Sequence, residues 1–109
     1  VNIGSELSKS GFEPENAENA YAELRAYPNL RIRGVMAMLP LSDDTALLNA
    51  LCKKMRALFE KLREKDENIK YLSMGMSGDW RLCVENGSNM IRLGTSLFGP
   101  RRYPAAENA

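Results

Sequence analysis

The chain has 109 residues, which is enough for one small domain with one modest hydrophobic core. Its formal net charge of +1 argues against general nucleic-acid binding, which requires a basic excess, and no apolar run approaches the roughly 20 residues that cross a bilayer. Histidine is absent, so Ser-His and Cys-His catalysis are excluded, together with the commonest metal ligand.

A strand and a helix are predicted for the first 29 residues. Val1 to Gly4 is a short β-type stretch followed by a loop. Pro14 suits the first turn of a helix, because its missing N–H costs nothing there. Apolar residues then recur at helical spacing, at Ala17, Ala20, Tyr21 and Leu24. The sequence Tyr-Pro-Asn at residues 27–29 should end this helix.

A second strand is predicted for residues 30–38, L-R-I-R-G-V-M-A-M. The segment begins with strict alternation and continues as an apolar run, which is typical of a strand that is buried in a parallel sheet. Gly34 within it indicates close packing or a bulge. Pro40 should close the strand.

The longest helix is predicted from Thr45 to Glu67, with Ser42, Asp43 and Asp44 as N-cap candidates. One apolar stripe runs along it at spacings of three and four: Leu48, Leu51, Met55, Leu58, Phe59 and Leu62. We expect this stripe to pack against the sheet.

The last third of the chain contains two predicted strands, each followed by a turn of small residues. Residues 71–76 precede Ser77-Gly78, and residues 90–93 precede Gly94-Thr95. Between them, residues 79–85 should form a short helix that Asn86-Gly87 ends.

Strands and helices therefore alternate along the chain, which predicts an α/β fold with parallel strands and right-handed connections. We interpret residues 1–109 as one domain of about four strand–helix units. Within it, residues 100–109 are expected to form a flexible tail. Cys52 and Cys83 lack metal-type spacing and are expected to be buried, reduced thiols of a cytoplasmic protein.

The two turns near the C-terminus are candidates for an anion site. Backbone N–H groups at such turns point positive charge at a ligand, and glycine allows the ligand to approach closely. The hydroxyls of Ser77 and Thr95 and the backbone at Gly94 are suited to a phosphate. Arg92 should share the inward face of its strand with Gly94. In the alternative interpretation these are ordinary strand-to-helix turns, and Arg92 pairs with a carboxylate.

The order and spacing of five segments resemble the YggS/PROSC family of pyridoxal-phosphate-binding proteins. The segments are V-N-I-G at 1–4, K-S-G at 9–11, L-R-I-R-G-V-M-A-M at 30–38, L-S-M-G-M-S at 72–77 and R-L-G-T-S-L-F-G at 92–99. The resemblance covers nearly the whole chain and about half of a family member. It implies the C-terminal half of a TIM (β/α)₈ barrel of the alanine racemase N-terminal-domain type.

The resemblance also implies the cofactor pyridoxal 5′-phosphate (PLP) and a role in vitamin B6 homeostasis, with no firmly established catalytic activity. It assigns Ser77, Gly94 and Thr95 to the cofactor phosphate, and Arg92 to the pyridine nitrogen. An arginine there does not keep that nitrogen protonated, so the ring is a weaker electron sink.

The expected partners are PLP and the N-terminal half of the barrel, which carries the Schiff-base lysine of the family and is absent from this chain. No nucleic-acid or membrane partner is expected. The main alternative is a fragment of an amino-acid racemase-like PLP enzyme, for which Tyr71 and Tyr103 are the only remote acid–base candidates. A phosphate-binding half-barrel of another pathway and a half-barrel that acts only by assembling with another chain are the remaining alternatives.

Overall fold

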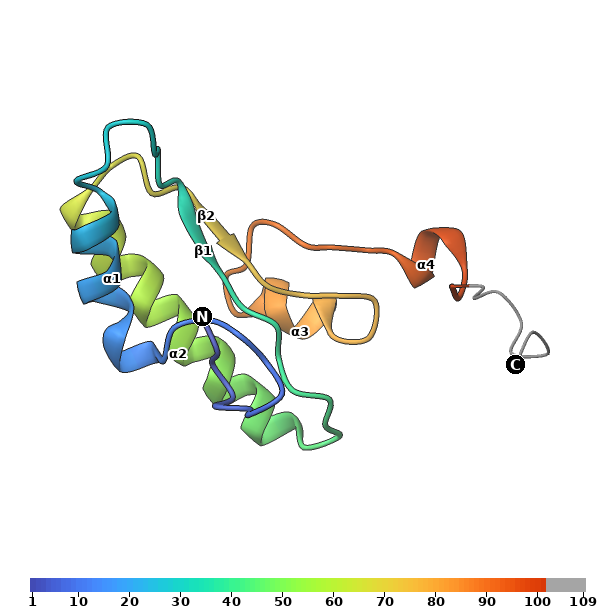
Figure 1. The fold of residues 1–109 in the computed structure, drawn as a ribbon. Helices are drawn as coiled ribbons and strands as arrows, with labels where there is room; N and C mark the ends of the chain where they lie inside the picture. The colour runs from blue at the N-terminus through green and yellow to red at the C-terminus, as the bar shows by residue number, and fades with distance from the viewer. Residues whose placement is uncertain (102–109) are drawn as a thin grey trace, which may run out of the picture.

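The computed structural model describes residues 1–101 and consists of helices that alternate with two short parallel strands (Figure 1). In chain order the elements are η1 (Pro14–Asn16), α1 (Ala17–Leu24), β1 (Gly34–Met36), α2 (Thr45–Lys65), β2 (Tyr71–Ser73), α3 (Trp80–Glu85) and α4 (Thr95–Phe98). The predicted α/β class with parallel strands is confirmed.

The two strands pair in parallel, with Gly34 opposite Tyr71 and Met36 opposite Ser73. A third segment joins the other edge of β2 through one parallel bridge, between Ser73 and Met90. The carboxyl ends of all three segments therefore lie at the same edge of the sheet. This edge is where ligands bind in parallel α/β folds.

The strands β1 and β2 approach each other closely at Gly34. A Cβ atom on Gly34 would collide with the backbone carbonyl oxygen and the Cβ atom of Tyr71. Glycine is therefore required for steric reasons, and the predicted close packing is confirmed.

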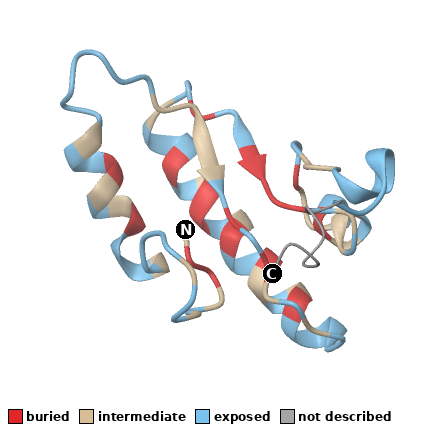
Figure 2. Ribbon diagram, turned by 45° about the vertical axis from the view of Figure 1, so that its right-hand side comes forward, coloured by how far each residue is buried: buried red, intermediate tan, exposed pale blue. Residues whose placement is uncertain are grey.

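The hydrophobic core lies between one face of the sheet and the helices (Figure 2). Helix α2 is its largest contributor, with these buried residues: Leu48, Cys52, Met55, Leu58, Phe59 and Leu62. Five of them belong to the predicted stripe, whereas Cys52 does not, and the predicted Leu51 is only partly buried. Leu72 and Met74, which are fully buried, meet the stripe from the sheet. The other face of the sheet is less covered, since Met36 is 47% exposed and Met90 is 42% exposed.

Helix α2 begins where the sequence predicts and ends two residues earlier. Asp44 is the N-cap, and its Oδ1 accepts a hydrogen bond of 3.1 Å from the Leu47 N–H. At the other end Asp66 has an extended backbone conformation, and its side chain accepts a hydrogen bond of 2.7 Å from the buried Tyr21 hydroxyl. This contact joins α1 to the end of α2.

The shorter helices differ from the predictions at their starts, and α1 also ends at Leu24, before the predicted stop at residues 27–29. The helix expected from Pro14 begins as the single 3₁₀ turn η1, and α-helical geometry starts at Ala17. Helix α3 begins at Trp80 and stops at the predicted Asn86-Gly87, where Gly87 adopts the left-handed φ of 100°.

The predicted strands are longer than the observed ones. The strand expected at residues 1–4 is not formed, because the Val1 amine makes one hydrogen bond of 2.8 Å to the Met36 carbonyl and Asn2 bonds to its own loop. The strand expected at 90–93 is reduced to the bridge at Met90. A regular ladder needs repeated pairing. Around Met90 it is limited to three backbone hydrogen bonds, which join Asn89 to Leu72, Met90 to Met74 and Arg92 to Gly75.

Two further expectations concern the ends of the chain and membranes. The expected tail at residues 100–109 lies outside the described residues from Arg102 onward. Among the described residues, no helix is both long and apolar enough to cross a membrane.

The close approach at Gly34 predicts that Gly34→Ala destabilises the protein by about 1–3 kcal/mol, because an added methyl group overpacks a rigid backbone contact. Gly78→Ala is the matched control, since a Cβ there meets no atom within 4 Å. Urea denaturation followed by circular dichroism measures both variants. Equal stability of the two variants would show that β1 and β2 can shift apart at no cost.

The contact between Tyr21 and Asp66 predicts a dependence of stability on pH. The Tyr21 hydroxyl is the main cause that holds the pKa of the Asp66 carboxyl below its ordinary value of 3.8. Such a group stabilises the fold above its ordinary pKa, and this stabilisation is lost as the pH falls through the folded-state value. Tyr21→Phe should therefore be less stable than the wild type at neutral pH, and the difference should narrow below pH 3.8. Urea denaturation at several pH values tests this, and a difference that does not vary with pH contradicts it.

Candidate functional site

The structure brings the two predicted turns into contact. The Ser77 Oγ atom accepts a hydrogen bond of 3.0 Å from the backbone N–H of Ser96, in the first turn of α4. Ser77 is partly exposed, and Gly94 and Thr95 are exposed. Three of the four predicted site residues therefore form one accessible patch at the carboxyl ends of the strands.

A network of hydrogen bonds fixes the shape of the first turn. Asp79 Oδ1 accepts a hydrogen bond of 2.7 Å from the Met76 N–H, and the Met76 carbonyl accepts bonds from the N–H groups of Asp79 and Trp80. The backbone of both turns can be approached from outside, because a Cβ atom added to Gly78 or Gly94 would meet nothing within 4 Å. A small anion can therefore reach backbone N–H groups here.

Arg92, the fourth predicted residue, lies across the carboxyl ends of the strands. Its backbone N–H donates to the Gly75 carbonyl at 2.8 Å, and its Nη2 donates to the Ala37 carbonyl at 2.9 Å. Its Nε atom is buried and has no hydrogen-bond partner among residues 1–101. Within residues 1–101 no carboxylate forms an ion pair with Arg92, so the alternative of a carboxylate partner is wrong there. A buried donor without a partner is costly and indicates a missing acceptor.

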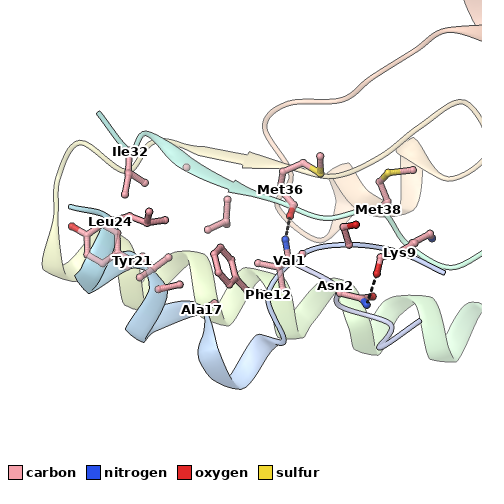
Figure 3. Close-up of a pocket in the computed structure, with 16 residues that line it drawn as sticks. Val1, Asn2, Lys9, Phe12, Ala17, Tyr21, Leu24, Ile32, Met36 and Met38 are labelled. Atoms are coloured by element: carbon pink, nitrogen blue, oxygen red, sulfur yellow. Dashed lines mark hydrogen bonds between the residues drawn. The ribbon is translucent and has the colours of Figure 1, made fainter. Parts of the chain in front are cut away.

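A cavity lies elsewhere, between α1, the N-terminal loop and the free edge of β1 (Figure 3). Its volume is about 530 Å³, and most of its lining is apolar, including Tyr21, Leu24 and Ile32. No residue of the two turns lines it. The cavity follows from the sheet topology, because β1 has a paired strand on one side only. We therefore base the candidate site on the polar turns and not on cavity size.

Lys9 and Asn2 border this cavity, but the loop itself occupies their polar groups. Lys9 Nζ lies 2.6 Å from the carboxylate of Glu6 and donates to the Leu39 carbonyl at 3.2 Å. The Asn2 side chain donates to the Glu6 carbonyl and accepts from the Glu6 N–H. These contacts give both residues a structural role in the N-terminal loop.

The two cysteines pack against each other behind the turns. Both are free and buried, with their Sγ atoms 3.9 Å apart. Burial, followed by the neighbouring Cys52, raises the pKa of the Cys83 thiol to about 12, and burial also raises the pKa of Cys52. Because the thiolate is the reactive form, neither cysteine is an activated nucleophile. The part of the chain that the structure describes also contains no cluster of three His, Cys, Asp or Glu residues that could hold a metal ion.

Of the two remote acid–base candidates, the structure describes Tyr71, which is not at the site. Tyr71 begins β2, so it lies at the opposite end of the strand from Ser77, and its ring packs 5.7 Å from the Arg33 guanidinium. Tyr103 lies outside the described residues.

Sequence reasoning missed three contributions to the site. The Ser96 N–H and the Ala37 carbonyl are backbone groups, which carry no sequence signal. Asp79 was expected only at the start of a helix, although its side chain also shapes the turn. An acidic residue two positions after Ser77 is the signal that would have indicated this.

Comparison with known proteins gives the family. The alanine racemase N-terminal domain matches residues 1–102. The chain belongs to this family. Members of this domain family are TIM-barrel-type folds, which agrees with the parallel strands and with the position of the site at their carboxyl ends.

Two curated relatives of this chain share a name, and a solved structure is also similar. The chain is 37% identical over 110 residues to the pyridoxal phosphate homeostasis protein of Haemophilus influenzae, covering 99% of this chain and 46% of the relative. It is 36% identical over 104 residues to the protein of the same name from Aquifex aeolicus, covering 94% and 46%. The structure of PipY from Synechococcus elongatus with PLP bound matches with a TM-score of 0.73 and 35% identity, over 85% of this chain and 45% of PipY. The chain thus spans about half the length of these relatives.

The contact between the turns predicts that Ser77→Ala accelerates hydrogen exchange at the Ser96 amide about fivefold, since a net hydrogen bond contributes roughly 1 kcal/mol. Exchange measured residue by residue by NMR tests this. Ser10→Ala is the control, because Ser10 is an exposed loop residue distant in sequence from both turns. Unchanged exchange at Ser96 would mean that the two turns are not held together by this bond.

Proposed function

We propose that the protein binds pyridoxal 5′-phosphate and serves vitamin B6 homeostasis, with this chain supplying the phosphate-binding part of the site. The proposal rests on the hydrogen bond between the Ser96 N–H and the Ser77 Oγ, which joins the two turns. Beside them lies Arg92, whose buried Nε atom has no partner among the described residues. The names of the relatives and the PLP-bound structure of PipY support the identity of the ligand.

The turns offer donors of the kind that a phosphate dianion needs. The Ser77 hydroxyl accepts from Ser96, which leaves its own hydrogen free to donate to a phosphate oxygen. N–H groups in the first turn of a helix have no partner within that helix, so those of Gly94 and Thr95 are available. The Thr95 hydroxyl adds a further donor. Hydrogen bonds from these groups to a charged phosphate are stronger than neutral ones.

Arg92 fits the ring end of the cofactor. A guanidinium has donors only and stays protonated, so it donates to a pyridine nitrogen that carries no proton. The Nε atom of Arg92 lacks an acceptor, and its Nη2 is held in place by the Ala37 carbonyl. When bound, PLP supplies an electron sink, which is weakened when the ring nitrogen is unprotonated. Arg92 therefore suits binding and storage of the cofactor better than general carbanion chemistry.

The chain's own lysines do not complete a covalent site. Lys9 is tied to Glu6 and Leu39, and Lys70 precedes β2, at the far end of that strand. The remaining lysines lie on the exposed surface of α2: Lys53, Lys54, Lys61 and Lys65. We propose that the other half of the barrel, the N-terminal one, provides the Schiff-base lysine and covers the exposed sheet face, in a cytoplasmic protein.

The phosphate contacts can be tested by combining Ser77→Ala with Thr95→Val in the intact protein. Loss of two hydrogen bonds to a charged group should weaken PLP binding by about tenfold or more. Pyridoxal, which lacks the phosphate, is the matched ligand and should bind the variant and the wild type alike. Equilibrium dialysis measures both affinities.

An unchanged affinity for PLP would overturn the assignment of the phosphate to these turns. An equal loss for PLP and pyridoxal would show that the substitutions damage the fold and not the phosphate contacts.

A further inference from the structure

The segment that contains Arg92 is attached to β2 partly by side-chain hydrogen bonds, which Asn89 and Ser88 make. On the side of β2 that faces away from β1, the Leu72 N–H and the Lys70 carbonyl would normally pair with the backbone of a neighbouring strand. Here the Asn89 side chain serves both groups. Its Oδ1 accepts from the Leu72 N–H at 2.8 Å, and its Nδ2 donates to the Lys70 carbonyl at 2.7 Å.

The Asn89 amide therefore takes the place of a peptide group. The backbone N–H of Asn89 also donates to the Leu72 carbonyl at 3.1 Å, so one residue occupies two polar groups of β2 and the carbonyl of Lys70 just before it. Leu72 is fully buried, and its N–H would be left without a partner if the Asn89 side chain were removed. Such a loss leaves a buried donor unsatisfied, which is costly.

Ser88 strengthens the same junction from the buried side. Its Oγ lies 2.6 Å from the Met74 carbonyl and 3.0 Å from the carbonyls of Leu72 and Met90. One hydroxyl hydrogen serves these acceptors one at a time. The hydroxyl therefore bridges β2 and the Met90 segment at their point of contact.

The register of this segment decides where the Arg92 side chain lies. Side chains alternate between the faces of a sheet, so a shift of one residue would move Arg92 from the exposed face to the face covered by helices. The backbone of the segment bonds to the β2 side at Asn89, Met90 and Arg92, around the single bridge between Ser73 and Met90. The Asn89 side chain adds two bonds to this register at the start of β2. The three bonds of Asn89 are made three residues before Arg92 and hold that register.

We infer that Asn89 is a positioning residue for Arg92, setting the register that directs the guanidinium to the carboxyl ends of the strands. Asn89 contacts the beginning of β2, so it acts on the site through Arg92 and not on the ligand. This inference rests on the proposed PLP site for its effect on affinity. Its structural part, the register, does not depend on a ligand.

A double-mutant cycle separates this role from a general loss of stability. PLP affinity of the intact protein is measured by equilibrium dialysis for the wild type, Asn89→Leu, Arg92→Ala and the double variant. Asn89→Leu should weaken binding to about the same extent as Arg92→Ala, and the double variant should be within about twofold of Arg92→Ala, because residues that act through one contact are not additive.

A second measurement tests the register without any cofactor. The Arg92 amide donates to the Gly75 carbonyl at 2.8 Å, so hydrogen exchange at this amide reports the attachment of the segment. Asn89→Leu should speed this exchange by about tenfold, equivalent to roughly 1.4 kcal/mol. The control Asn19→Leu alters an exposed asparagine on α1 and should leave it unchanged.

The outcomes distinguish this inference from the proposed function. Two results would overturn the positioning role. One is unchanged hydrogen exchange at the Arg92 amide in Asn89→Leu. The other is an equal loss of PLP affinity when Asn89→Leu is introduced into the wild type and into Arg92→Ala. If Arg92→Ala alone leaves PLP affinity unchanged, the ring contact of the proposed function fails. The exchange measurement then still decides whether Asn89 sets the register.

Discussion

The parallel alignment of β1, β2 and the Met90 segment determines where every candidate site residue lies. Parallel strands place their carboxyl ends at one edge, so the turns that follow them meet even though they are distant in sequence. The alignment depends on the close contact at Gly34, because any side chain there would push β1 away from Tyr71. Helix α2 then covers one face and leaves the other face with exposed methionines.

Local signals in the sequence were sufficient to predict the helices. The stripe of α2 is defined by residues spaced three and four apart, and its start by a capping aspartate, so both could be predicted without tertiary information. Its end could not, because Asp66 leaves the helix to accept a hydrogen bond from Tyr21, which is 45 residues away in the sequence. That contact exists only after α1 has packed against α2.

The strands were predicted less well, since a strand depends on a partner that the local sequence does not specify. Residues 1–4 and 90–93 have β-type composition, yet the first stretch is a turn and the second makes one bridge. In both cases asparagine side chains compete with the backbone ladder, Asn2 by bonding within its loop and Asn89 by replacing a peptide group.

The candidate site, too, could be predicted only in part from the sequence. Turn chemistry and alternation were enough to select Ser77, Gly94, Thr95 and Arg92, and the fold brings the first three together. The surroundings of Arg92 could not be predicted, because its partner is the carbonyl of Ala37, a backbone group that every residue possesses. What distinguishes Arg92 is the buried Nε atom without a partner, and only the folded chain reveals it.

The most direct test of the proposed site is a crystal structure of the intact protein with PLP bound. We expect phosphate oxygens within hydrogen-bonding distance of the Ser77 hydroxyl and of the backbone N–H groups at Gly94 and Thr95. We also expect the Arg92 guanidinium to face the pyridine nitrogen. A cofactor located in the apolar cavity beside Lys9, or a phosphate held by groups outside these two turns, would contradict the proposed site.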